Sequence, residues 1–294
     1  MPGCSAESFS TSSLGSASGP LLQQPSESLA GRPSYVELTP FLASEVTHGL
    51  ASLQQLWQRG GYPLSHLAGS DALSWAWRQD FLRTFLQRDM PALGVRVPAE
   101  TMRRLWTMLA HLQGQPLNAS QLGLALGGAT HTTVARHLDL LVDALMVRRL
   151  APYLPHVGKR LVKSPRIYVR DSGLLHALLG IQDAQALQGH PIAGVSWEGF
   201  VIEQIAAALP ADAVLGYYRT AAGAELDLVA LVQGRTLAFE IKLSSAPKPA
   251  RGFWQALQDV KPDRSFVVAP VERGYELAAG VRVVGLAELT LQLK

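Results

Sequence analysis

The sequence predicts an α/β protein of several domains, in which helices come first and a mixed sheet with flanking helices comes last. Between residues 45 and 116, apolar residues recur every three or four positions, as on one face of a helix. In the last hundred residues, short runs of β-branched and aromatic residues alternate with turns, which is typical of strands. The chain has 294 residues, 48% of them hydrophobic, so it is long enough to bury two or three cores.

The composition excludes several classes of protein. The net charge of +3 permits a nucleic-acid partner without requiring one. Cys4 is the single cysteine, so neither an intramolecular disulfide framework nor a cysteine-built zinc site is expected. There is no run of 18 apolar residues, and the N-terminus lacks the basic and apolar order of a signal peptide. We therefore expect a cytoplasmic protein without a membrane partner.

The N-terminal part divides into a polar tail and a helical region. Residues 1–34 are rich in Ser, Gly and Pro, a composition typical of a disordered tail or linker. Apolar faces over 50–57, 75–86 and 102–112 then predict three helices, and Gly60-Gly61-Tyr62-Pro63 ends the first of them. We expect the tryptophans of this region to be core residues rather than a platform on which bases stack.

Residues 117–180 have the pattern of a winged helix-turn-helix. A short helix is expected over 119–126, with Asn118 as its N-cap, and Gly127-Gly128 follows as the turn. A second helix is expected over 130–141, with Val134, Leu138 and Leu141 facing the core. After it, residues 146–150 and 167–169 can pair as the strands of a wing.

The same segment supplies the candidate DNA-binding residues. Side chains at the start of the second helix would be available to a groove, and a basic cluster between the wing strands suits phosphates. These candidates are Thr130, His131, Thr132, Arg136, Lys159, Arg160, Lys163 and Arg166. The alternative is that the unit is a protein–protein or interdomain module and that the basic loop is an ordinary solvated surface.

The candidate catalytic residues lie on a predicted hairpin near the C-terminus. Two apolar strand-like runs are joined by a turn at residues 233–235. Paired strands lie about 4.8 Å apart, so Asp227 on the first and Glu240 on the second can share one end of a sheet. Lys242 is two residues beyond Glu240 and therefore points to the same face.

This spacing predicts a cation site. Like charges about 4 Å apart repel by roughly 4 kcal/mol at an effective dielectric near 20. A cation such as Mg²⁺ between the carboxylates would stabilise them, and Glu198, in the first turn of a helix predicted over 197–205, would complete the acidic cluster. The alternative is that these charges are solvated at strand ends and that Glu240 and Lys242 form an ordinary ion pair.

The remaining elements complete an α/β layer architecture. Residues 217–219 end a strand before the hairpin, and 181–196 are expected to be a loop. A helix over 251–260 and strands over 266–268 and 281–284 follow, which together predict a mixed sheet with helices on it.

Two resemblances follow from these motifs. A helix bearing Glu198 and strands bearing Asp227 and Glu240-x-Lys242 occur in the same order as in PD-(D/E)xK nucleases. The sequence motifs Gly158–Pro165 and Asp171–Leu175, together with the helix break at Gly60–Pro63, resemble those of a family of bacterial AAA-type ATP-binding proteins. The resemblance covers most of residues 12–285. Members of that family carry a nuclease-like C-terminal domain of unknown function.

The resemblance implies a division into four parts. Residues 1–44 would be the end of an AAA-type ATPase domain, partly disordered, and 45–116 a lid-like helical region. Residues 117–180 would be the winged helix-turn-helix and 181–294 the PD-(D/E)xK nuclease-like domain. No G-x-x-x-x-G-K-[ST] motif occurs in the sequence, so we expect a truncated relative without an ATP site of its own, for which a complete ATPase paralogue would be a partner.

The implied function is that of a DNA-binding protein with a Mg²⁺-dependent nuclease-like domain. Glu198, Asp227 and Glu240 would be the metal ligands, and Asp227, Glu240 and Lys242 the catalytic residues. The alternative is a non-catalytic DNA-binding or protein-interaction module without nuclease or ATPase activity.

Overall fold

The computed structural model describes residues 37–46, 48–155 and 158–293, so most of the predicted ATPase remnant, residues 1–44, lies outside the described residues. The first part of the described chain is helical, as the apolar periodicity predicts. Its helices are α1 (Ala43–Val46), α2 (Leu50–Arg59), α3 (Pro63–His66), α4 (Asp71–Thr84), the π-helical segment η2 (Phe85–Asp89), α5 (Met90–Ala92), α6 (Ala99–His111), α7 (Ala119–Ala125) and α8 (His131–Asp143).

Helices α7 and α8 confirm the two helices predicted around the Gly127-Gly128 turn. The Asn118 side chain caps α7 by accepting a hydrogen bond of 3.1 Å from the backbone N–H of Gln121. Both turn glycines have positive φ values, 82° and 86°, which side-chain-bearing residues rarely adopt. The three predicted core residues of α8 are fully buried: Val134, Leu138 and Leu141.

The strands form one mixed sheet, which confirms the predicted mixed sheet with flanking helices. Its order is β2-β1-β3-β4-β5-β6-β8-β7. The predicted pairing of residues 146–150 with 167–169 is confirmed by the antiparallel β1–β2 pair, in which Val147 is opposite Val169. β1 also pairs in parallel with β3, so strands from both sides of residue 180 belong to the same sheet. The bounds are β1 (Val147–Pro152), β2 (Arg166–Val169), β3 (Val214–Arg219), β4 (Glu225–Val232), β5 (Arg235–Ile241), β6 (Arg264–Val268), β7 (Tyr275–Ala278) and β8 (Val281–Val284).

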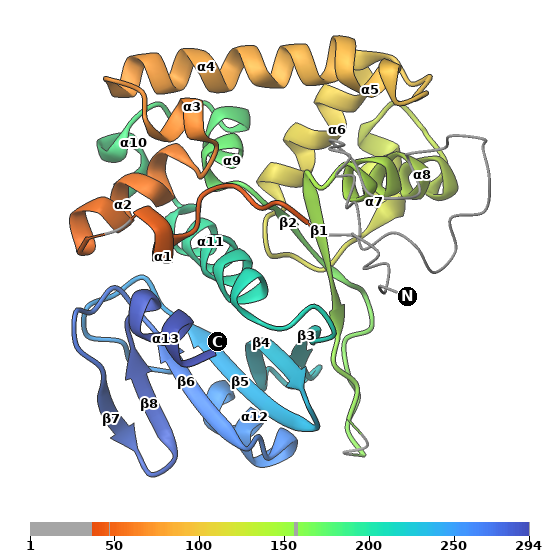
Figure 1. The fold of residues 1–294 in the computed structure, drawn as a ribbon. Helices are drawn as coiled ribbons and strands as arrows, with labels where there is room; N and C mark the ends of the chain where they lie inside the picture. Colours follow the sequence, from red (N-terminus) through yellow and green to blue (C-terminus); the bar gives the residue numbers. More distant parts are fainter. Residues whose placement is uncertain (1–36, 47, 156–157, 294) are drawn as a thin grey trace, which may run out of the picture.

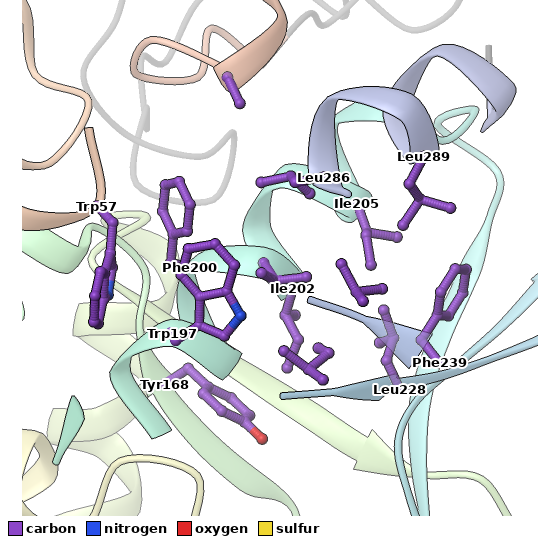
Figure 2. Packing of buried hydrophobic residues seen from close by; sticks show 14 of the residues in the cluster. Trp57, Tyr168, Trp197, Phe200, Ile202, Ile205, Leu228, Phe239, Leu286 and Leu289 are labelled. Atoms are coloured by element: carbon purple, nitrogen blue, oxygen red, sulfur yellow. The ribbon is translucent and has the colours of Figure 1, made fainter. Parts of the chain in front are cut away.

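Helices cover both faces of the C-terminal strands (Figure 1). These helices are α11 (Ala193–Ala208) and α13 (Leu286–Leu293) on one face and α12 (Arg251–Val260) on the other. The two preceding helices, α9 (Ser172–Leu178) and α10 (Ala184–Gln188), lie beside the N-terminal helices. Leu228 and Phe239 pack with apolar residues of α11 and α13, as Figure 2 shows. On the opposite face, Val229 and Ala238 pack with α12. Helix α11 therefore lies between the helical part and the sheet and carries apolar contacts to both.

Several elements escaped the sequence analysis, among them the short helices α1, α3 and α5, and also α9, α10, β7 and α13. α10 lies in the predicted loop 181–196, although the Asp183 side chain caps it with a bond of 2.8 Å from Ala186 N–H, a recognisable signal. β7 pairs with β8 at the sheet edge, and α13 ends the described chain. Among the described residues, no helix is both long and apolar enough to cross a membrane.

The first helix break and the Asp171-Ser172-Gly173 motif meet in space. Gly60, with φ at 79°, ends α2, and the next amide, that of Gly61, donates to Asp171 Oδ2 at 2.8 Å. Asp171 Oδ1 accepts from Leu174 N–H at 2.8 Å and so caps α9. A Cβ on Gly173 would overlap the carbonyl oxygen of Arg59. These motifs are thus a contact between two helix ends.

Gly173→Ala tests this contact. The added methyl group must push the end of α2 away, which we expect to lower the free energy of unfolding by about 1–3 kcal/mol. Gly194→Ala in α11 is the matched control, because its Cβ meets nothing within 4 Å, and we expect it to be neutral or slightly stabilising. Urea unfolding of both variants measures the difference. Equal stabilities would contradict a tight approach of the two helices.

Candidate functional site

The β4–β5 hairpin brings Asp227 and Glu240 together, as the sequence predicts. Its two-residue turn has positive φ at both Gln233 (49°) and Gly234 (77°), which matches the twist of paired strands. Leu228 is opposite Phe239 in the resulting register, so Asp227 and Glu240 occupy the next position. Asp227 Oδ2 accepts a hydrogen bond of 2.8 Å from the backbone N–H of Ile241, which holds its carboxylate at the end of β5.

A β-bulge in β4 sets the direction of Asp227. Gly216 is opposite Val229 and Tyr218 is opposite Leu226, so two residues of β4, Asp227 and Leu228, face the single Tyr217. A bulge interrupts alternation and re-aims side chains. Leu226 and Val229 accordingly both pack against α12, although they are three residues apart.

Asp227 and Glu198 approach the same guanidinium. Asp227 Oδ1 is 4.0 Å from Arg166 Nη1, which is 3.6 Å from Glu198 Oε1 on α11. Glu198 Oε1 also accepts a hydrogen bond of 2.6 Å from the buried Tyr168 hydroxyl. Glu198 therefore lies near the hairpin acids, as predicted, and the guanidinium of Arg166 lies between Glu198 and Asp227.

Arg166 occupies a place that the sequence analysis did not foresee. That analysis put it in a basic loop available to phosphates. In the structure it is the first residue of β2, with a side chain only 4% exposed, and it also pairs with Glu225. Its guanidinium lies over the Tyr217 ring, 4.6 Å from the centroid. Its Nε is buried without a hydrogen-bond partner among the described residues. Arg166 thus belongs to the acidic cluster rather than to the exposed basic surface.

Burial disfavours the ionised form of the acids in this cluster and raises their pKa values. Burial, and then the negative charge of Asp227, raise the pKa of Glu198 to about 7. The same two causes raise the pKa of Glu240 to about 7, although Lys242 Nζ lies 2.7 Å from its Oε1 and opposes the shift. Burial also raises the pKa of Asp227. For Lys242, burial alone would lower the pKa, but the carboxylates of Asp227 and Glu240 outweigh it and raise the pKa.

The cluster meets part of the requirement for a divalent cation. Within 37–46, 48–155 and 158–293, no group of three or more His, Cys, Asp or Glu side chains is arranged to hold a metal. Arg166 stands beside both Glu198 and Asp227, in the place that a cation would neutralise. Mg²⁺, however, commonly binds through one or two carboxylates together with waters and substrate phosphates. The donor chemistry of Asp227 and Glu240 fits such a site, whereas ligation by Glu198 stays a prediction.

The other candidate DNA-binding residues lie in two exposed groups. At the start of α8, the Thr130 hydroxyl already caps the helix by accepting from Thr133 N–H at 3.2 Å. In the connection between β1 and β2, Lys159 Nζ is 2.6 Å from Asp259 Oδ1. The exposed candidates are Thr130, His131, Thr132, Arg136, Lys159, Arg160 and Lys163.

The sequence analysis missed three residues that surround the acids: Tyr168, Glu225 and Arg219. Arg219 Nη1 lies 3.4 Å from Glu225 Oε2, which extends the network of charges along β3 and β4. Glu225 is two residues before Asp227, and that spacing was the one available signal. The local sequence does not indicate that β2 lies near this site. The contacts of Arg166 and Tyr168 with the acids depend on the long-range pairing of β1 with β3.

Glu198→Gln tests the raised pKa. The folded-state pKa of about 7 lies above the ordinary value of 4.5, so between these values the folded protein holds a proton that the unfolded chain has lost. The free energy of unfolding therefore falls as pH rises through this window. Gln carries no such penalty and still accepts from Tyr168. We expect the variant to gain on the order of 1–3 kcal/mol relative to wild type between pH 5 and pH 8.

Urea unfolding at both pH values, in EDTA, measures this gain. Glu272→Gln is the control, because Glu272 is an exposed loop residue away from the cluster. A stability difference between Glu198→Gln and wild type that does not change with pH would refute a raised pKa.

Comparison with known proteins gives families without an assigned function. Residues 50–185 match a domain of unknown function (DUF8612), and residues 193–289 match a second one (DUF4143). The crystal structure of protein VC1899 from Vibrio cholerae aligns with 85% of this chain and 57% of that chain, at 15% identity and a TM-score of 0.26.

Two mycobacterial proteins are much more similar in sequence. The uncharacterized proteins Rv2008c of Mycobacterium tuberculosis and Mb2031c of Mycobacterium bovis are each 49% identical to this chain over 271 residues. The match covers 92% of this chain and 60% of each relative. The chain is thus similar to uncharacterized mycobacterial proteins, spans about three fifths of their length, and matches the models of two domains of unknown function.

Proposed function

We propose that this chain is a DNA-binding protein whose C-terminal sheet carries a Mg²⁺-dependent nuclease-like site. The observation that carries the proposal is the convergence of Glu198, Asp227, Glu240 and Lys242, from one helix and one hairpin, at a buried spot. Two of these carboxyls have pKa values near 7. Displaced pKa values of this kind are concentrated at functional sites, because a fold seldom collects buried like charges without a use for them.

Asp227 and Glu240 would hold the cation, which when bound would polarise a phosphodiester and favour the hydroxide form of a water. Lys242 lies beside Glu240 and would place a positive charge where negative charge develops on the phosphate. The unpartnered Nε of Arg166 would donate to an acceptor oxygen, such as one on the scissile phosphate. Glu198, whose Oε1 lies 3.6 Å from Arg166 Nη1, would be a third ligand.

DNA would be brought to this site by the unit formed by α7, α8 and the β1–β2 hairpin, which we interpret as a winged helix-turn-helix. His131, Thr132 and Arg136 are exposed on the first turns of α8, as required of residues that enter a groove. Arg160 and Lys163 would contact the phosphate backbone. Because β1 continues into the large sheet through β3, DNA bound to this unit would lie close to the sheet that bears the acids.

We also propose a relationship to the bacterial AAA-type ATP-binding proteins with nuclease-like C-terminal domains. Two motifs that carry this resemblance, Gly60–Pro63 and Asp171–Leu175, pack against each other through the Gly61–Asp171 hydrogen bond. A shared structural contact gives both motifs a reason to occur together. On this proposal, the curated relatives and this chain would share a DNA-processing role.

A second candidate function is a DNA-binding or interaction module without catalysis. It is favoured by the ion pairs, because Arg166 and Lys242 already offset part of the negative charge without any metal. Buried ion-pair networks also shift pKa values in purely structural sites. Cleavage assays separate the two functions.

Nicking of supercoiled plasmid is the first test. We expect wild type to nick DNA in Mg²⁺ or Mn²⁺ and to be inactive in EDTA. Asp227→Asn and Lys242→Met should each lower the rate by about 100-fold or more, because each removes charge that acts on the phosphate. Gel shifts in EDTA provide the control and should be unchanged in both variants. Wild type that shifts DNA but never nicks it with any divalent metal would support the module instead.

Arg166→Gln tests the relation between this arginine and the metal. Loss of one partner of a buried ion pair should destabilise the protein by about 3–5 kcal/mol without metal. Because the freed carboxylates then lack a cation, Mg²⁺ should recover more stability in the variant than in wild type. Thermal unfolding with and without Mg²⁺ measures both effects.

Arg264→Gln is the matched control for this experiment. Arg264 also lies over an aromatic ring, that of Phe266 at 4.8 Å, but it bonds to Gln292 rather than to an acid. Its response to Mg²⁺ should equal that of wild type. If Mg²⁺ stabilises wild type and Arg166→Gln by the same amount, Arg166 does not share the place of the cation.

A further inference from the structure

A pocket of about 630 Å³ is lined in part by the β3–β4 turn, which directly precedes Glu225 of the acidic cluster. Three separate segments line it: the connection after β1, the β3–β4 turn itself and the first turns of α12. The lining residues are Lys159, Arg160, Thr220, Ala221, Ala222, Gly223, Ala224, Arg251, Gly252 and Gln255. Three of these are cationic and none is acidic.

Backbone contacts hold the walls of this pocket in place. The N–H of Ala221 donates to the carbonyl oxygen of Arg160 at 2.9 Å, and Leu161 forms a β-bridge with Thr220. On the other wall, a Cβ at Gly252 would overlap the carbonyl oxygen of Gly223, so α12 begins in direct contact with the turn. The cationic side chains therefore extend from a defined frame rather than from a loose loop.

Within the described residues, an acid neutralises one of the three cationic side chains of this pocket and leaves the other two without an acidic partner. Lys159 is paired with Asp259, whose other oxygen accepts from the Tyr218 hydroxyl at 2.9 Å. Within the part of the chain that the structure describes, neither Arg160 nor Arg251 has a carboxylate partner. Both are exposed, and Arg251 is the first residue of α12, where helix amides lack intrahelical acceptors.

We propose that this pocket binds a phosphate group. Two unpaired guanidinium groups on opposite walls match the fork geometry with which arginine binds phosphate oxygens. The volume exceeds that of one phosphate and lies in the range of pockets that hold nucleotide-sized ligands. Ala224, which lines the pocket, is three residues before Asp227, or about 10 Å along the strand. The proposal does not rest on cleavage.

The experiment compares two substitutions of equal size at Ala222, which is exposed in the turn. Ala222→Glu places an acid in the pocket, whereas Ala222→Gln adds the same bulk without charge. Arg251→Ala removes one proposed ligand, and Arg235→Ala removes an exposed arginine at the far end of the β4–β5 hairpin. The whole 294-residue chain is used in EDTA, so that binding at the acidic cluster through a metal does not contribute.

Two probes distinguish the source of the phosphate. Fluorescein-labelled single-stranded DNA is followed by anisotropy at two salt concentrations, and inorganic pyrophosphate by calorimetry. We expect Ala222→Glu and Arg251→Ala to weaken DNA binding by about tenfold, Ala222→Gln and Arg235→Ala by less than about twofold, and the salt dependence to fall in Arg251→Ala.

Each outcome has a definite reading. Loss of DNA binding in the two pocket variants identifies a nucleic-acid phosphate as the ligand. Pyrophosphate binding that Ala222→Glu abolishes, without any effect on DNA, identifies a free phosphate compound. Absence of binding to either probe, or binding that is equal in Ala222→Glu and Ala222→Gln, would overturn the proposal. Because all measurements are made without metal, failure of nuclease activity would leave this result unaffected.

Discussion

The burial of charge between β2, α11 and the β4–β5 hairpin is the constraint on which the rest of the site depends. Isolated buried ions are too costly to persist, so each acid in this region needs a partner. Arg166 serves Glu198, Glu225 and Asp227, and Lys242 serves Glu240. Arg166 belongs to the segment that follows α8, so its ion pairs join the predicted DNA-binding unit to the predicted nuclease-like unit. The β1–β3 pairing does the same through the backbone.

The geometry of the β4–β5 hairpin positions Asp227 beside Glu240. The Gln233-Gly234 turn sets the register that places Asp227 beside Glu240. The bulge opposite Tyr217 then turns Asp227 out of the ordinary alternation, while its bond to Ile241 N–H keeps the carboxylate in place. Bulges are common next to active sites, where the extra residue disrupts the ladder locally and re-aims a side chain.

Local patterns were sufficient to predict much of the fold, and long-range pairing accounts for most of what they missed. The α8 core residues and the hairpin turn follow from periodicity and turn chemistry, so Leu138 and Gly234 were assigned correctly. Arg166 was placed on an exposed loop because its neighbours in sequence, Lys163 and Ser164, are those of a loop. Its burial depends on β2 lying against β1 and on β1 lying against β3, and no local pattern encodes those contacts. The bulge at Asp227 was hidden for the same reason, since a bulge is a property of two paired strands.

The acidic cluster and the basic pocket are built on the same short stretch of chain, and this arrangement bears on how a polyanion would bind. Residues 220–224 line the pocket, and Glu225 begins the acidic network one residue later. A phosphate strand is attracted to the pocket and repelled by the carboxylates unless a cation intervenes. Arg166 provides one such cation from the chain itself, and a bound Mg²⁺ would provide a second. On the proposed binding mode, a nucleic-acid strand held at Arg160 and Arg251 would enter the acidic site only when the carboxylates there are neutralised.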